Sequence, residues 1–179
     1  MKRSSRDPVD AWLDERTRSG PFPRGSGLPE AAFRGAAAGV LGGAVMMMTM
    51  KAGARALLPE GEDREPPPKK LVETLARSSG VELSDVQATA AGMGVHLGYS
   101  ALWGAVYGAV QSRLHPPDAL HGLLLGGLMY ATSFPSFGLL PRLGVLPPPT
   151  QQPLEKAALP LGAHLVFGVA TSTAFRALS

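Results

Sequence analysis

Long runs without any charged residue are the feature that most limits what this chain can fold into. Four such runs cover residues 35–50, 86–112, 119–141 and 157–175. A hydrocarbon core about 30 Å thick needs about 20 helical residues, so the last three runs are long enough as they stand. The first is extended when Arg34, Lys51 and Arg55 lay their stems along the helix and reach the headgroups. The sequence therefore predicts four transmembrane helices, over residues 31–57, 86–113, 119–140 and 154–177.

A soluble helical protein is the alternative, but a soluble helix normally carries one charged face, and these segments carry none. The expected fold is an all-α integral membrane four-helix bundle in residues 31–179. It follows a polar N-terminal tail, residues 1–30, in which Pro8 to Arg18 favour a short surface helix. In the loop 58–85, three prolines start an amphipathic helix that ends at Gly80, and Ser84 with Gln87 has the form of a capping box.

Composition excludes several classes of function. The chain has no cysteine, which rules out disulfides and thiolate chemistry, and its net charge of +3 without a basic aromatic patch argues against nucleic-acid binding. No catalytic triad, phosphate loop or carboxylate pair occurs in a suitable context, so an enzyme is not predicted. Basic residues near the span ends favour a cytoplasmic N-terminus.

The chain contains a candidate internal repeat. The glycine pair 42–43 recurs at 126–127, and each pair is followed by Leu-Leu-Pro and then by three prolines, at 66–68 and 147–149. The second and fourth spans match at an offset of 68, which aligns His96 with His164 and Gly94 with Gly162. Each copy is one helical hairpin that enters the membrane from the same side, so the two are expected to form a parallel repeat.

Two kinds of helix face stand out. One kind is rich in small residues that let helix backbones approach closely in lipid. The other carries histidine, aromatic and hydroxyl side chains at helical steps in the second and fourth spans. The packing residues are predicted to be Gly35, Gly39, Gly43, Gly94, Gly98, Gly122 and Gly126. The candidate functional face is predicted to comprise His96, Tyr99, Trp103, Tyr107, His164, Phe167 and Thr171.

The histidines allow two interpretations. An imidazole in an apolar span is costly unless it is paired, and an interhelical hydrogen bond is sufficient to explain it. Alternatively, His96 and His164 meet at a midplane site for haem, a metal ion or a proton pathway. His115, Asp118 and His121 are further metal-ligand candidates. No cofactor is predicted. No mid-span carboxylate supports the site at His96 and His164, and Asp118 is as easily a first-turn helix carboxylate with His121 as its neighbour one turn on.

The order of Gly, Pro and His motifs resembles the YagU-type family of small bacterial inner-membrane proteins. The motifs are R-G-x3-G-x2-GG at residues 34–43, H-x2-Y from His96, HG-x3-GG from His121 and H-L-x-F-G from His164. The family is biochemically poorly characterised, so the resemblance implies a topology and an inner-membrane location, with no catalytic residue to transfer.

The expected function is accordingly that of a non-enzymatic membrane protein, either a structural or accessory subunit or a homo-oligomer. Its partners would be the lipid bilayer and other membrane subunits or itself. A small transporter or channel with a midplane histidine and aromatic site is the first alternative, and a haem- or metal-binding redox subunit is the second.

Overall fold

The computed structural model describes residues 27–60, 65–114 and 118–178, and within these ranges every regular element is helical. The long helices are α2 (Leu28–Leu57), α4 (Asp85–Leu114), α5 (Asp118–Ser133) and α7 (Leu154–Ala177). The short ones are α3 (Pro67–Ser78), α6 (Leu139–Arg142) and the 3-10 helix η1 (Pro149–Gln151). The all-α prediction is confirmed. The expected surface helix from Pro8 to Arg18 lies outside the described residues.

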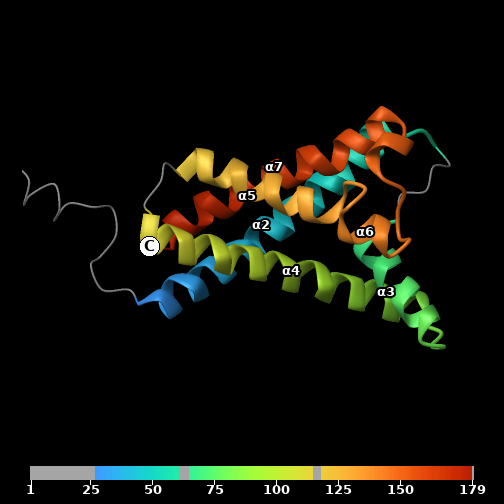
Figure 1. The fold of residues 1–179 in the computed structure, drawn as a ribbon, viewed down its shortest axis with the longest axis horizontal. Helices are drawn as coiled ribbons and strands as arrows, with labels where there is room; N and C mark the ends of the chain where they lie inside the picture. The colour runs from blue at the N-terminus through green and yellow to red at the C-terminus, as the bar shows by residue number, and fades with distance from the viewer. Residues whose placement is uncertain (1–26, 61–64, 115–117, 179) are drawn as a thin grey trace, which may run out of the picture.

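The four long helices run in alternating directions (Figure 1). The start of α2, the end of α4, the start of α5 and the end of α7 form what we call the N-terminal end of the bundle. The opposite end, here the loop end, carries α3, α6 and η1. Successive long helices therefore enter the bundle from opposite ends, as the hairpin interpretation expects.

Two described helices, α2 and α7, are long and apolar enough to cross a membrane. Helix α4 has sufficient length at 30 residues, but its polar side chains, among them His96 and Gln111, lower its mean hydropathy. Helix α5 has 16 residues and is therefore too short by the same measure. Length and composition thus support two of the four predicted spans.

Helix α5 ends earlier than its charge-free run predicted. The third span was expected to reach residue 140, whereas the helix stops at Ser133 and a short helix, α6, begins at Leu139. Pro135 explains the break, because it lacks an amide hydrogen and disfavours helical backbone at the residue before it. The chain then turns, with the Gly138 amide donating to the Pro135 carbonyl at 2.6 Å.

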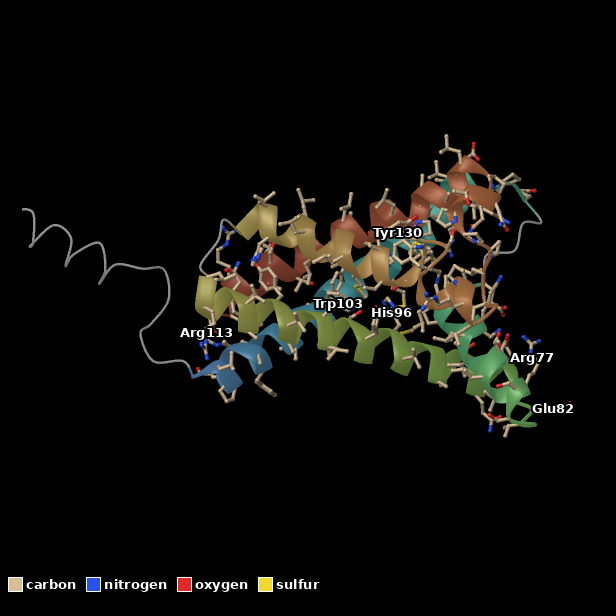
Figure 2. The ribbon with its side chains drawn as sticks, in the orientation of Figure 1. Arg77, Glu82, His96, Trp103, Arg113 and Tyr130 are labelled. Carbon is tan, nitrogen blue, oxygen red and sulfur yellow. The ribbon has the colours of Figure 1, made fainter. Side chains whose placement is uncertain are left out.

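The long helices are ordered α4, α2, α7, α5, with α2 and α7 at the centre (Figure 1). Gly42 allows this central pair to approach closely, because a side chain there would collide with Thr171 of α7. The short proline-containing turn in the sequence at 115–118 predicts that the second and third spans are antiparallel neighbours, and this prediction is only partly correct. Backbone contact between α4 and α5 is sparse, because bulky side chains of α4, including Trp103, lie toward the bundle interior (Figure 2).

Glycine seams join the helices within each hairpin. In the first hairpin, a Cβ atom on Gly39 would lie 2.9 Å from the Cα of Gly104, and one on Gly35 equally close to that of Gly108. In the second, a Cβ on Gly122 would lie 2.6 Å from the carbonyl oxygen of Gly168, and one on Gly126 would lie 2.8 Å from the carbonyl carbon of His164. Such spacing leaves no room for a side chain, so these helices pack backbone to backbone.

The packing face of α4 differs from the predicted one. Gly94 and Gly98 are exposed, and a Cβ on either would have no neighbour within 4 Å, so they do not pack helices inside this chain. The face toward α2 is built from Gly104 and Gly108 instead, with Ser100 one turn before them. Helix α4 has small residues on two faces, and the position of α2 decides which face is buried.

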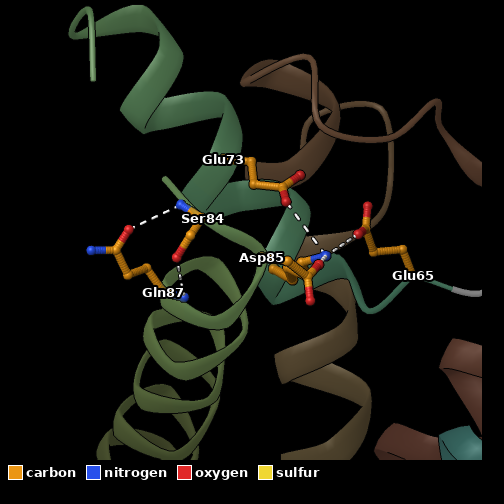
Figure 3. A network of polar contacts seen from close by, with 6 residues as sticks. Glu65, Glu73, Ser84, Asp85 and Gln87 are labelled. Carbon is orange, nitrogen blue, oxygen red and sulfur yellow. Dashed lines mark hydrogen bonds and ion pairs between the residues drawn. The ribbon is translucent and has the colours of Figure 1, made fainter. Parts of the chain in front are cut away.

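Helix α3 is fastened to the start of α4. The predicted capping box is confirmed, since the Gln87 amide donates to the Ser84 hydroxyl at 3.3 Å and the Ser84 amide donates to the Gln87 side chain at 2.9 Å (Figure 3). Gly80, with φ of 71°, follows the end of α3 as expected. The Lys69 ammonium lies among three carboxylates, donating to Asp85 at 2.6 Å and to Glu65, with Glu73 at 3.5 Å.

These partners, Asp85 before Glu65, raise the pKa of Lys69 above its ordinary value of 10.5. Lys69 therefore stays charged at neutral pH and ties the two helices together. A Cβ on Gly92 would lie 2.8 Å from the Lys69 Cα, which shows how closely α3 rests on α4.

Candidate histidine and aromatic site

The predicted functional face is divided between two environments. On α7, His164, Phe167 and Thr171 are 3%, 0% and 0% exposed, so this half of the face is fully internal. On α4, Tyr107 is buried, while the side chains His96, Tyr99 and Trp103 are half-buried. The structure thus places all seven residues toward the bundle interior, but at different depths.

His96 and His164 each have one ring nitrogen bonded to a backbone carbonyl. His96 Nε2 lies 3.0 Å from the carbonyl oxygen of Gly43, on the neighbouring helix α2. His164 Nδ1 lies 2.7 Å from the carbonyl oxygen of Pro160, one turn earlier on its own helix. Because a carbonyl only accepts, the bonded nitrogen must carry the proton in each neutral ring. The two histidines therefore have opposite tautomers, and each leaves its second nitrogen as an acceptor.

The imidazole of His164 is enclosed by aromatic rings near the end of α5. Its centroid lies 5.7 Å from that of Tyr130 and 5.3 Å from that of Phe134, both in edge-on orientations. No hydrogen bond joins His164 to His96 in the described structure. The predicted shared histidine site is therefore not a directly bonded pair. The bond of His96 is interhelical, as the structural interpretation expects, whereas His164 bonds within its own helix.

Tyr99 bridges the sparse junction between α4 and α5. Its hydroxyl oxygen lies 3.0 Å from Thr132 Oγ1 and 3.3 Å from Ser133 Oγ. Both of those hydroxyls donate to the Met129 carbonyl, at 2.9 and 2.8 Å, so the Tyr99 hydroxyl donates its single hydrogen toward this pair, with Thr132 Oγ1 the nearer acceptor. The Trp103 ring stands perpendicular to the Tyr99 ring with centroids 6.2 Å apart. This polar bridge substitutes for backbone packing between the two helices.

Two buried hydroxyls flank the glycine pair of α2. Ser100 Oγ and Thr171 Oγ1 are both buried and have no hydrogen-bond partner in the described structure. Ser100 Oγ would lie 2.5 Å from a Cβ on Gly43, and Thr171 Oγ1 occupies the same kind of position beside Gly42. Buried hydroxyls normally find a partner, so these two are the least satisfied groups at mid-bundle. Sequence reasoning identified Thr171 and missed Ser100, which lies one helical turn after His96.

The three metal-ligand candidates lie largely outside the described side chains. No group of three His, Asp or Glu side chains suited to a metal ion occurs among the described residues. His115 lies outside the described residues, as does the side chain of Asp118. The His121 ring lies 5.7 Å from the Tyr107 ring and is tilted against it. Chemically, the arrangement presents hydroxyls and imidazoles that can donate and accept hydrogen bonds.

Comparison with known proteins adds no identification: no family model, no curated protein and no solved structure matches this chain.

Proposed function

We propose that this chain is a four-span protein of the bacterial inner membrane that works through helix packing, either as an accessory subunit of a larger complex or as a homo-oligomer. The carrying observation is a partial inversion of polarity, in which apolar side chains face outward and several polar side chains join a core that also holds Phe167 and Met129. The outer faces of the long helices expose large apolar side chains, with Leu41 at 52%, Leu102 at 60%, Leu124 at 52% and Val169 at 42%. The buried positions include Ser100, Gln111, Ser133, His164, Thr171 and Ser172.

This inversion favours lipid over water around the bundle. Soluble monomers rarely expose apolar patches that continue over several helices. In a bilayer, exposed leucines meet lipid tails and polar side chains turn toward other helices. Helix α5 is about 24 Å long at 1.5 Å per residue, and the segment through α6 supplies the remaining length. We place the N-terminal end of the bundle on the cytoplasmic side.

A repeated hairpin accounts for the two glycine seams. Gly39 meets Ser100 in the first hairpin, and Gly122 meets Gly168 in the second. These pairs correspond by an offset of 68 on the second helices and of 83 on the first helices, one less than the offset between the glycine pairs 42–43 and 126–127. The offset of 68 is the one that aligns His96 with His164. The shared geometry supports one duplicated unit, and with the motif order it supports kinship to the YagU-type proteins.

Transport is the second candidate, and the unpartnered hydroxyls favour it. Ser100 and Thr171 lie beside His96 and Gly42 near the middle of the bundle, where polar groups mark many substrate pathways. A water moving through the bundle would supply the hydrogen-bond partners that these two groups lack, and a small cation would be coordinated by their oxygen atoms.

A double variant separates the two functions. The protein purified in mild detergent is expected to run as a homo-oligomer or with a second subunit, and His96→Ala with His164→Ala should keep that assembly. Loss of two carbonyl hydrogen bonds should cost about 2 kcal/mol in total. The measurements are size-exclusion chromatography with light scattering and proton or cation flux in liposomes.

A solitary monomer in every mild detergent would contradict the packing role. Flux in the unsubstituted protein that disappears in the double variant, with the assembly intact, would replace that role with transport.

A further inference from the structure

The N-terminal end of the bundle holds a second polar cluster, to which all four long helices contribute. The Tyr107 ring of α4 lies at its centre, 5.7 Å from the ring of His121 on α5 and 5.5 Å from that of Phe175 on α7. Gln111, one turn further along α4 and 1% exposed, donates from Nε2 to the Tyr107 hydroxyl at 2.8 Å. These contacts hold the side chains of three helices together at this end.

Arg34 supplies the contribution of α2. It shares a helix face with Ala38, which is fully buried and belongs to the same core cluster as Tyr107 and Phe175. Side chains in helices lean toward the helix N-terminus, which directs the Arg34 guanidinium toward the N-terminal end of the bundle. Its side chain is only 17% exposed. Arg34 is therefore a largely buried cation at the same end of the bundle as the aromatic cluster.

Two nitrogen atoms at this end are buried without a hydrogen-bond partner among the described residues. They are Arg34 Nε and His121 Nδ1. Arg34 forms an ion pair in which its Nη2 atom lies 3.5 Å from a carboxylate oxygen of Glu30. The Glu30 side chain is 61% exposed. A buried guanidinium N–H without an acceptor is costly. The cluster thus offers a positive charge and two nitrogen atoms in need of a partner.

We propose that this cluster binds the phosphate of an anionic phospholipid. A phosphodiester carries one negative charge, and its oxygens accept paired hydrogen bonds from the Nε and Nη atoms of a guanidinium. The proposal rests on the proposed membrane insertion, which places this end of the bundle at the level of the headgroups. Arg113 and Arg176, at the ends of α4 and α7, add positive charge there.

Native mass spectrometry tests this site by measuring the lipid bound to the full chain in detergent. The unsubstituted protein should retain phosphatidylglycerol in preference to phosphatidylcholine. Arg34→Gln should weaken phosphatidylglycerol binding roughly tenfold, the value of one charged hydrogen bond, and leave phosphatidylcholine unchanged. Arg34→Lys, which keeps the charge and is the safer variant for folding, should lose part of the preference. Arg142→Gln, at the exposed loop end, is the matched control and should bind as before.

Equal losses of phosphatidylglycerol binding in Arg34→Gln and Arg142→Gln would overturn the site in favour of diffuse electrostatic attraction. Equal retention of phosphatidylglycerol and phosphatidylcholine by the unsubstituted protein would also overturn it. Inorganic phosphate should not displace the lipid, and efficient displacement would assign the cluster to a free anion instead. Alkaline extraction of membranes separates the two proposals. A chain released by carbonate would refute membrane insertion itself, whereas a retained chain without Arg34 dependence would refute only the lipid site.

Discussion

Gly104→Ala is expected to destabilise the bundle by about 2–3 kcal/mol, the usual cost of forcing atoms into a packed interior. The added methyl group would lie 2.6 Å from the Cα of Gly39, and the obstacle is backbone rather than a movable side chain. The helices α2 and α4 must therefore separate along the seam. Unfolding of the purified protein in a denaturing detergent, followed by circular dichroism, measures this change.

Gly98→Ala is the matched control on the same helix. Its methyl group would meet nothing within 4 Å, so stability should stay unchanged or rise by up to about 1 kcal/mol from the better helix former. Equal destabilisation by both substitutions would show that α4 packs through the Gly94 and Gly98 face. That result would reinstate the sequence-based prediction.

Phe167→Ala is expected to cost about 3 kcal/mol or more. Phe167 is 0% exposed and lies in the core cluster with Met46, Met129 and Ala163. Its loss leaves a cavity that these neighbours fill only in part, and the remaining void sets the cost. Fluorescence- or dichroism-monitored unfolding should show the reduced stability.

Phe137→Ala provides the comparison, since Phe137 is 65% exposed in the turn after α5. A change within about 0.5 kcal/mol is expected there. Phe167 was predicted to belong to a functional face, and a mild effect of Phe167→Ala on stability would return it to that role.

Local signals in the sequence predicted most helix boundaries. Helix α7 was expected over residues 154–177 and occupies Leu154–Ala177, while α2 begins three residues before its predicted start. These boundaries are set by local features, namely the charge-free runs, the prolines and the Ser84–Gln87 capping box. Each feature influences only nearby residues, so the sequence alone is sufficient to identify it. The end of α5 was missed although Pro135 signals it, because the charge-free run was followed past the proline.

The partners of the site residues could not be predicted in the same way. His96 bonds to a carbonyl on another helix, 53 residues away, and Tyr99 bonds to Thr132. Such contacts depend on the rotation of each helix about its axis. In α4 that rotation is ambiguous from sequence, because Gly94 and Gly98 offer one small face and Gly104 and Gly108 another. Arg34 was assigned only to the membrane boundary, since its burial depends on how α7 covers α2.

The central claim is that four helices cross the membrane, and cysteine labelling in intact bacterial cells tests it most directly. The chain contains no cysteine, so single cysteines at Ser79, Thr150, Leu114 and Leu178 give unambiguous signals. The first two lie at the loop end and the last two at the N-terminal end. With four spans, a membrane-impermeant maleimide should label positions 79 and 150 in intact cells, and positions 114 and 178 only after permeabilisation.

Position 114 decides between four spans and two. If only α2 and α7 crossed the membrane, the whole segment between them would stay on one side, and Leu114→Cys would label together with Ser79→Cys. That result would contradict the four-span bundle. Labelling of 114 and 178 alone in intact cells would reverse the orientation and keep four spans. With four spans, Leu114→Cys and Ser79→Cys label from opposite sides in either orientation.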